Sequence, residues 1–485
     1  MIDPAPISAM PYNSSRQQNH LTSGIGPGNI AASGLCIGCG SCVAKSARPD
    51  VRMGLDRYGQ MKPTAPRTWL QGGDEEFARI CPFSPVARDE DELAADHYPH
   101  AKNRDPLLGR FEAAFVGYVE EGEYRSNGSS GGMVTWVAAE LLRLGLVDGV
   151  AHVKESDGPQ LGGRLFHYSL SRNLQELQAG AKSRYYPVEL SGVLQSIREA
   201  PGRYAVVGIP CFIKAVRLAC ADDPILKERI AFTLGLFCGH MKSARMAESF
   251  AWQMGEDIGQ VKRLDYRIKS PDRPANWYRT QLTLENGETR AQDWWHLADG
   301  DWGAGFFQNP ACNFCDDVVA ETADIAFGDA WKEPYSSDGR GTNVVIVRSK
   351  TLLDAILAGI DDKRIALSHV DSDFVVATQA AGFRQRREGL SFRLTWPRMG
   401  IRPRKRVRAG SHSLSSQRKA VYIMRYWISF WSHRVFSIAR FLHSPGLYIL
   451  WARAALACYH GVAYSRGRIG RIAQSLGLAG SEGRT

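Results

Sequence analysis

Strand-like and helix-like patterns of apolar residues alternate between residues 111 and 400. Short apolar runs typical of strands occupy 113–120, 149–153, 164–170, 204–209 and 230–237, and helical patterns occupy 133–144 and 210–218. The turn Glu285-Asn286-Gly287, between 281–284 and 288–290, is typical of a hairpin. The patterning therefore predicts a mixed α/β (α+β) body with some antiparallel pairing.

The segments on either side of this body have different patterns. Residues 1–33 are rich in Ser, Gly, Asn and Pro without an apolar period, which predicts a flexible leader. Residues 34–110 contain few long apolar runs, so a folded unit there would depend on bound metal. After the body, assigned to residues 111–400, residues 401–485 form a basic tail with a helical pattern over 418–443.

Composition supports a folded protein that works inside a cell. The chain is 44% hydrophobic and 23% charged, which is typical of globular proteins. It begins Met-Ile-Asp-Pro-Ala-Pro, without the basic start and apolar core of a secretory signal. We therefore expect a cytoplasmic protein in which the clustered ones among its ten cysteines serve as metal or redox ligands and not as disulfides.

Three of these cysteines stand close together in Leu-Cys36-Ile-Gly-Cys39-Gly-Ser-Cys42. Soft thiolates held in one tight turn are the ligands that an iron–sulfur cluster requires. A ferredoxin run would place the fourth cysteine at position 46, where this chain has Ser46, so Cys81 in Cys81-Pro82 is the expected fourth ligand. Zinc is the alternative, although a third cysteine two residues on is unusual for zinc. The spacing favours a small ferredoxin-like 4Fe–4S unit over 34–110.

A second group of four cysteines is spread across the body. It consists of Cys211, Cys238, Cys312 and Cys315. Cys211 and Cys238 follow strand-like runs, where side chains from different strands can converge. Four thiolates suit either a 4Fe–4S cluster or structural zinc, and the spacing alone does not separate the two.

The segment Ser126-Asn-Gly-Ser129-Ser130-Gly131-Gly132 opens the predicted helix at 133–144. Glycines allow close backbone approach, and a helix N-terminus offers N–H groups to the phosphate of a nucleotide or flavin. The segment is neither the Rossmann fingerprint nor a P-loop, and Ser and Gly before a helix are also ordinary capping residues. Both interpretations stay open at this point.

Positive charge is concentrated in the tail. Residues 401–485 contain fifteen Lys or Arg against Glu482, a charge of +14, so the other 400 residues carry −4 of the total of +10. The basic run 402–408 precedes the helix 418–443, which has a basic face and an aromatic face. The pattern favours binding to an anionic membrane surface through residues 402–443, and the alternative is a helix packed on the body with its basic face in solvent. Nucleic acid is disfavoured because the body is acidic.

Taken together, and in their order along the chain, these motifs resemble those of the coenzyme F-420 hydrogenase/dehydrogenase beta-subunit family, which includes 7-hydroxymethyl chlorophyll a reductase. The matching stretches are Leu-Cys36-Ile-Gly-Cys39-Gly-Ser-Cys42, Ser129-Ser-Gly-Gly132, Gly180-Ala-Lys-Ser-Arg-Tyr185, Gly208-Ile-Pro-Cys211, Leu236-Phe-Cys238, Cys312-Asn-Phe-Cys315 and Ala323-Asp-Ile-Ala-Phe-Gly-Asp329. They run from about residue 34 to about residue 390.

The resemblance implies an iron–sulfur flavoprotein oxidoreductase with two 4Fe–4S clusters and FAD. It places Ser129, Ser130, Gly131 and Gly132 at the FAD phosphates and Lys182 near the flavin. It assigns the second cluster to Cys211, Cys238, Cys312 and Cys315. Asp329 is either structural or a cofactor ligand. His240 is a weak candidate for a proton donor and equally a histidine that supports a neighbouring ligand.

Three functions follow as hypotheses. The first is an enzyme that moves electrons between the clusters and FAD to reduce or oxidise a small organic substrate or a deazaflavin-type coenzyme, with ferredoxin or a deazaflavin or nicotinamide donor as redox partner. The second is an electron-transfer subunit of a larger redox complex. The third is a zinc-stabilised interaction protein that docks on membranes. Fold resemblance alone does not choose the substrate.

Overall fold

The computed structural model describes residues 24–46, 48–156, 164–398, 400–411 and 413–475. Most of the predicted leader, residues 1–23, lies outside the described residues. The described end of that segment contains the helix α1 (Pro27–Ala32).

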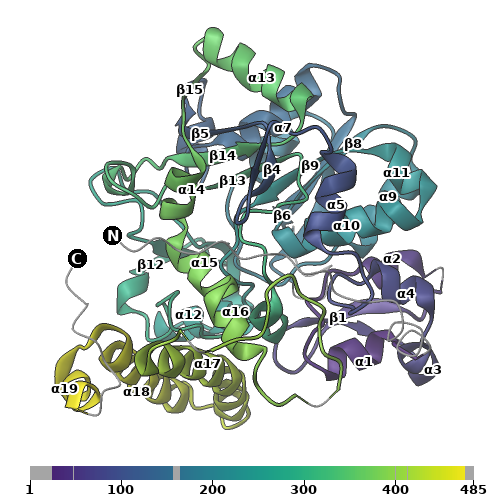
Figure 1. Cartoon of the computed structure of the whole chain (residues 1–485). Helices are drawn as coiled ribbons and strands as arrows, with labels where there is room; N and C mark the ends of the chain where they lie inside the picture. Colours follow the sequence, from purple (N-terminus) through teal and green to yellow (C-terminus); the bar gives the residue numbers. More distant parts are fainter. Residues whose placement is uncertain (1–23, 47, 157–163, 399, 412, 476–485) are drawn as a thin grey trace.

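An eight-stranded mixed sheet organises the body, in the strand order β15-β5-β14-β13-β9-β8-β6-β7 (Figure 1). Its strands are β5 (Ala113–Val119), β6 (Gly149–Glu155), β7 (Phe166–Ser171), β8 (Tyr204–Gly208), β9 (Ile230–Leu236), β13 (Ile325–Asp329), β14 (Asn343–Val347) and β15 (Ile365–His369). The four central strands β13, β9, β8 and β6 are parallel, and antiparallel strands extend the sheet on both sides. The mixed α/β prediction is confirmed.

Helices cover both faces of this sheet because its central strands are apolar on both sides. One face packs against α7 (Met133–Arg143) and α13 (Lys350–Asp361), with Trp136 and Ile356 fully buried between them and the strands. The opposite face packs against α9 (Ser191–Glu199) and α10 (Pro210–Asp222). Two smaller helices, α8 (Leu174–Ala179) and α11 (Pro224–Arg229), complete these layers.

Short elements build the N-terminal region, beside α9 and α10 (Figure 1). They are α2 (Ser41–Lys45), β1 (Arg52–Leu55), β2 (Met61–Thr64), α3 (Arg67–Gln71) and α4 (Glu75–Ile80). The chain reaches the body through α5 (Glu90–His97) and the hairpin β3 (Asn103–Asp105) and β4 (Gly109–Phe111).

A second, three-stranded antiparallel sheet lies beside the first. It consists of β10 (Val261–Asp265), β11 (Arg279–Leu284) and β12 (Thr289–Asp293), preceded by α12 (Arg245–Gln253). The hairpin predicted around Asn286 connects β11 and β12. The remaining small elements are α6 (Tyr124–Asn127), α14 (Ser372–Thr378), α15 (Ala380–Arg386), α16 (Glu388–Arg393), and the 3-10 helices η2 (Ile258–Gln260), η3 (Trp294–His296), η4 (Pro310–Phe314) and η5 (Tyr335–Ser337).

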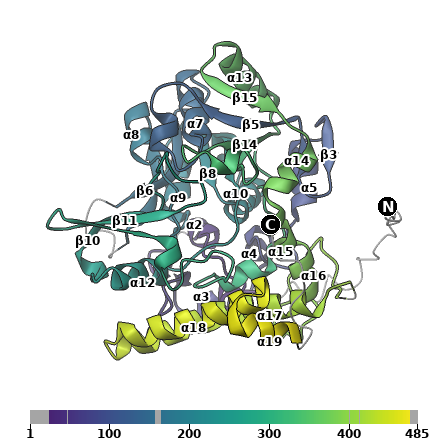
Figure 2. The same cartoon turned by 90° about the vertical axis from the view of Figure 1, so that its left-hand side faces the viewer.

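Three helices close the described chain: α17 (Ser416–Phe441), α18 (Pro445–Tyr464) and α19 (Gly467–Ser475). The helix predicted over 418–443 is thus present, shifted by two residues. Both views show α17 and α18 as a layer along one edge of the molecule (Figures 1 and 2). Within the described residues, no helix is long and apolar enough to cross a membrane.

The structure corrects the predicted roles of the two basic segments. The run 402–408 does not project toward a membrane: Lys405 pairs with Asp316 at 3.2 Å, and Arg406 pairs with Glu321 at 2.7 Å, inside an acidic pocket of the body. Nor is the basic face of α17 solvated as a whole. His433 is buried against Gln60, while aromatic residues on the opposite face are exposed.

Candidate functional site

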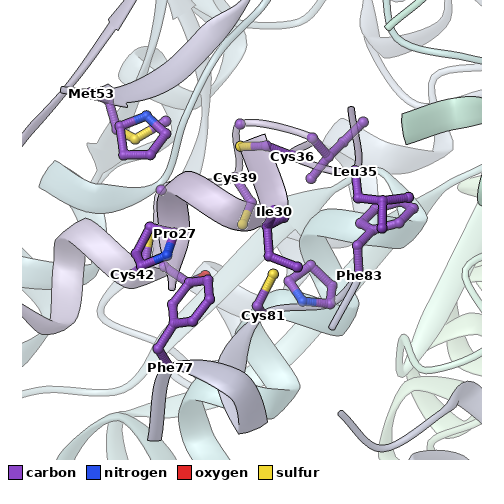
Figure 3. Close-up of a pocket in the computed structure, with 16 residues that line it drawn as sticks. Pro27, Ile30, Leu35, Cys36, Cys39, Cys42, Met53, Phe77, Cys81 and Phe83 are labelled. Atoms are coloured by element: carbon purple, nitrogen blue, oxygen red, sulfur yellow. The ribbon is translucent and has the colours of Figure 1, made fainter. Parts of the chain in front are cut away.

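The first cysteine group surrounds one pocket between α1, α2 and α4. Gly38 and Gly40 both have left-handed backbone angles, φ 82° and 84°, so the loop can turn sharply between the cysteines. Cys81 comes to the same pocket from the C-terminal end of α4. Figure 3 shows the four cysteines around this pocket, among apolar residues such as Ile30 and Phe77; the four are Cys36, Cys39, Cys42 and Cys81.

These four thiols lie within electrostatic range of one another. Burial raises the pKa of the Cys39 thiol to about 11, and the neighbouring Cys36 adds to the increase. The pKa of Cys42 is raised well above its usual range by burial and then by the other three thiols. Thiols with raised pKa values, such as those of Cys39 and Cys42, are costly to ionise without a cation beside them, and a bound metal would favour their ionised form.

The second cysteine group also converges, as the sequence predicts. β8 and β9 are adjacent and parallel, so Cys211 and Cys238 leave the same edge of the sheet. Cys312 lies in η4 and Cys315 directly follows it. The pKa of the Cys211 thiol is raised well above its usual range by burial and then by the other three thiols, which places all four together.

A buried arginine that the sequence did not identify lies against this group. The Arg386 guanidinium donates hydrogen bonds to the carbonyl oxygens of Cys312 at 3.2 Å, Cys238 at 3.2 Å and Gly239 at 2.6 Å. All four thiols raise the pKa of Arg386, and its Nε is buried without a hydrogen-bond partner. The guanidinium therefore supplies fixed positive charge where four thiolates would gather.

Four thiolates in each group suit either a 4Fe–4S cluster or a single zinc ion. Four thiolates on one zinc ion lie about 3.8 Å apart, because Zn–S bonds are ~2.3 Å long. Across the described part of the chain, no three Cys, His, Asp or Glu side chains are placed to hold one metal ion. All ten cysteines are free thiols. A 4Fe–4S cluster takes one thiolate at each iron and so accepts a wider set of four.

The glycine-rich segment at residues 126–132 connects β5 to α7. A side chain at Gly131 would meet Asn343 and Gly117, and one at Gly132, with φ 87°, would meet the backbone of Tyr124. These glycines are thus required by the packing of the protein chain itself. The hydroxyls are also engaged: Ser130 donates to the carbonyl of Thr342, and Ser129 accepts from the N–H of Ser183.

A polar pocket opens beside this segment. Its lining includes Ser129, Arg267, Lys269, Tyr278 and Gly341. Lys269 Nζ donates to the carbonyl oxygen of Ser130 at 2.6 Å. Burial lowers the pKa of Lys269 to about 7, and the nearby Arg125, Lys182 and Arg267 lower it further. Arg267 and Lys269 line the pocket itself, while Arg125 and Lys182 lie near it and pair with Asp338 and Asp265, so the two lining cations are the ones that could face an anion.

Asp329 acts on this pocket through Arg267. The two side chains form a two-point ion pair, with distances of 3.0 and 3.2 Å. Arg267 also lies over the Tyr278 ring, 4.2 Å from its centroid. Lys182 pairs with Asp265 at 3.0 Å and lies near Lys269. Arg267 and Lys269 belong to a short polar stretch, Arg267-Ile-Lys-Ser, that carries no recognisable motif, so sequence reasoning missed them.

His240, the weak catalytic candidate, is buried away from both pockets. Its ring stacks on Trp302 at 4.3 Å, and it lines neither the cysteine pocket nor the pocket at Ser129. Burial lowers its pKa well below the usual range, and its Nε2 has no hydrogen-bond partner. The stacked, neutral ring fits a supporting residue better than a proton donor.

Comparisons with known proteins identify relatives of the body of the chain. A family model described as coenzyme F420 hydrogenase/dehydrogenase, beta subunit N-term, matches residues 114–195, and the corresponding C-terminus model matches residues 202–373. Together they span just over half of the chain.

Three curated relatives are similar to the chain. An uncharacterized protein of Methanocaldococcus jannaschii is 27% identical over 229 residues, 46% of this chain and 57% of that protein. The coenzyme F420-dependent sulfite reductase of the same organism is 23% identical over 335 residues, 66% of this chain and 45% of that protein. The coenzyme F420 hydrogenase subunit beta of Methanosarcina barkeri is 22% identical over 261 residues, 51% of this chain and 78% of that protein.

The chain spans about half the length of the first two relatives. Among solved structures, a chain of the F420-reducing NiFe hydrogenase complex from Methanosarcina barkeri is similar with a TM-score of 0.47 and 19% identity, over 62% of this chain and 99% of that one. The two consecutive family matches decide the assignment: this chain belongs to the coenzyme F420 hydrogenase/dehydrogenase beta-subunit family.

Proposed function

We propose that the chain is an iron–sulfur flavoprotein oxidoreductase that transfers electrons between two 4Fe–4S clusters and FAD. The single observation that carries this proposal is the convergence of eight cysteines into two groups of four. When bound, FAD exchanges two electrons with an organic partner and single electrons with a cluster. The protein supplies the ligands, the positions and the electrostatics.

The two cysteine groups lie close enough to form one electron path. Lys62 Nζ donates to the carbonyl oxygen of Cys36 at 2.5 Å. The same ammonium lies near the Cys312 thiol, where it partly offsets the burial that raises the pKa of Cys312 to about 11. Gly34, just before Cys36, packs against Pro310 of η4, the element that bears Cys312. These contacts support passage of electrons from a surface cluster to an inner one.

The polar pocket at Ser129 supports FAD as the third centre. Arg267, Lys269 and Lys182 would hold the phosphates, and Asp329 would fix Arg267. The hydroxyls of Ser129 and Ser130 already form hydrogen bonds within the protein, so the role of these two residues would be to shape the pocket.

Aromatic rings connect this pocket to the second cysteine group. Tyr278 packs on Trp294 and Trp294 on Tyr185, with centroids 5.4 and 5.7 Å apart. Tyr185 then contacts Trp302, which stacks on His240, two residues after Cys238. The flavin and the inner cluster would therefore lie at the two ends of one packed aromatic core.

The relatives' names favour a deazaflavin coenzyme of the F420 type as the organic partner, with the chain acting as an electron-transfer subunit of a larger complex. The test is to purify the protein anaerobically, measure bound FAD, and mix it with reduced F420 in a stopped-flow spectrometer. We expect one FAD per chain and bleaching of the flavin and cluster absorbance by the coenzyme. A colourless protein that contains only zinc would support the interaction-protein alternative and overturn the proposal.

Two variants locate the flavin. Arg267→Gln is expected to lose FAD and retain iron, because the guanidinium lines the pocket at Ser129 and contacts neither cysteine group. Arg340→Gln is the matched control, since Arg340 is exposed and pairs only with Asp338. Equal loss of FAD in both variants would place the flavin elsewhere.

A further inference from the structure

Exposed apolar side chains are concentrated on the C-terminal helices. Sixteen large hydrophobic residues are exposed over the described part of the chain, and ten of them lie between residues 416 and 475. The ten are Ile423, Trp427, Trp431, Ile438, Phe441, Leu442, Leu447, Leu450, Tyr464 and Ile472. Such a concentration on one layer marks an interaction surface, whereas single exposed residues need no explanation.

The geometry of α17 turns this apolar surface away from the body. At 100° per residue, Trp427, Trp431 and Ile438 share one face of the helix. The opposite face, with Ile428, Phe436 and Ala439, is buried on the body. Phe441, which continues the outer face, is 82% exposed. Among the described residues, the apolar outer face of α17 is therefore left without a partner.

Helix α18 extends the same outer surface. Tyr448 and Ala452 face the body, where the Tyr448 hydroxyl donates to Asp299 at 2.9 Å. Leu447 and Leu450 lie on the exposed side, and Leu450 is 73% exposed. Helices α17 and α18 lie side by side along one edge of the molecule (Figures 1 and 2). We treat their outer faces as one exposed surface. We call this the outer hairpin surface.

Charge decides which occupant fits this surface. Residues 416–475 contain nine Lys or Arg and no Asp or Glu. Arg453, Arg468 and Arg471 are exposed, and among the ion pairs of the described chain none includes them. Exposed tryptophan and phenylalanine, on helices that carry arginine and no carboxylate, suit the boundary between lipid headgroups and acyl chains, where rings are half-buried and cations meet phosphate.

We infer that the outer hairpin surface docks the protein on an anionic lipid bilayer. Trp427, Trp431 and Phe441 would insert at the boundary between headgroups and acyl chains. The exposed arginines Arg453, Arg468 and Arg471 would contact lipid phosphates. Lys405 and Arg406 of the basic run 402–408 take no part, because carboxylates of the body neutralise them. This inference is independent of the proposed cofactors, since the surface contacts neither cysteine group.

The test uses the full chain and two kinds of vesicle, pure phosphatidylcholine and phosphatidylcholine mixed with phosphatidylglycerol. We expect co-sedimentation with the anionic vesicles and a blue shift of tryptophan fluorescence. The triple variant Trp427→Ser, Trp431→Ser, Phe441→Ser should reduce the partition coefficient by at least about tenfold, because three large apolar side chains no longer enter the bilayer. All three residues are exposed, so the variant should fold, which circular dichroism will check.

The matched control is Trp295→Ser, which removes an equally exposed tryptophan, at 58%, from the body; its binding should equal that of the wild type. A second variant, Arg453→Gln, Arg468→Gln, Arg471→Gln, should lose the preference for anionic vesicles. Equal partition of the wild type and the triple serine variant would overturn the inference. A second result would also overturn it: the wild type does not bind vesicles but self-associates with increasing concentration, and the serine variant does not self-associate. A second copy of the chain would then cover the surface.

Discussion

The two cysteine groups reach similar ligand sets by opposite routes. Three thiols of the N-terminal group lie within the seven residues 36–42: Cys36 and Cys39 on the loop between the short helices α1 and α2, and Cys42 within α2. The body group draws on residues 211–315 and depends on the parallel pair β8 and β9. The first is a local motif carried by short elements, and the second is a product of tertiary structure.

The groups also differ in the charge around them. At the N-terminal group, a half-buried lysine, Lys62, contacts one ligand's carbonyl oxygen. At the body group, the fully buried Arg386 contacts the carbonyl oxygens of two ligands and lies near all four thiols. The comparison predicts that the N-terminal group depends on its metal for structure, whereas the body group depends on the protein for its electrostatics.

The largest expected difference between the two groups is in their local stability after metal removal. Isolated helices of five or six residues are unstable, so residues 25–83 should open when a chelator strips iron under reducing conditions. We expect amide hydrogen exchange there to accelerate on the order of a thousandfold, while β8, β9 and β13 remain protected. Exchange mass spectrometry measures both. Equal acceleration in the sheet would contradict the comparison.

Replacing Arg386 should weaken only the body group. Arg386→Met leaves three carbonyl oxygens without their donor, that of Cys312 being buried, and we expect a loss of roughly 3 kcal/mol in the free energy of unfolding. The reduction potential of one cluster should fall by roughly 60 mV, because reduction adds negative charge beside a lost cation. Denaturant titration and a spectroscopic redox titration measure these. The control Arg384→Met, at an exposed position, should change neither.

Asp329 provides a test of the flavin pocket. Asp329→Asn removes the partner of a buried guanidinium, so Arg267 should lose its position. We expect FAD affinity to fall roughly thirtyfold, about 2 kcal/mol, with iron content unchanged. Fluorescence titration with FAD measures the affinity, and the exposed Glu333→Gln serves as control. If iron and FAD were lost together, Asp329 would be a general structural residue.

The smallest effect concerns pH. The pKa of Lys269 is lowered to about 7, so its ammonium form is complete below that pH and is lost as pH rises. A phosphate needs the ammonium form, so FAD affinity should be level at low pH and fall roughly tenfold per unit above about pH 8. Lys269→Met should remove this slope, whereas Lys182→Met should leave it. A slope retained in Lys269→Met would assign the titration to another group.

The sequence predicted the elements around the site because these are strongly patterned. The strands from β5 to β9, the helices α7 and α10, and the hairpin at Asn286 follow directly from apolar runs and turn residues. The convergence of Cys211 with Cys312 was predicted by combining strand ends with a Cys-x-x-Cys pair. The serine- and glycine-rich segment was identified, although its glycines pack on the protein itself.

What the sequence could not supply depends on distant contacts. Arg386, Arg267 and Lys269 lie in polar stretches without a motif, and they gain a role only when the fold buries them. The prediction for part of the basic run was wrong for the same reason. Lys405 and Arg406 appear free in the sequence, but Glu90, Asp316 and Glu321 of the body neutralise them, and the packed face of α17 is set by the body beneath it.

The central claim is that two separate four-cysteine groups each hold one cluster. The most direct measurement is iron and sulfide per chain, with low-temperature electron paramagnetic resonance, in anaerobically purified wild type and in two matched variants, Cys39→Ser with Cys81→Ser and Cys211→Ser with Cys312→Ser. We predict about eight irons in the wild type and about four in each variant, with a different reduced signal lost in each case. Zinc in place of iron, or an iron content that one variant leaves unchanged, would contradict the account.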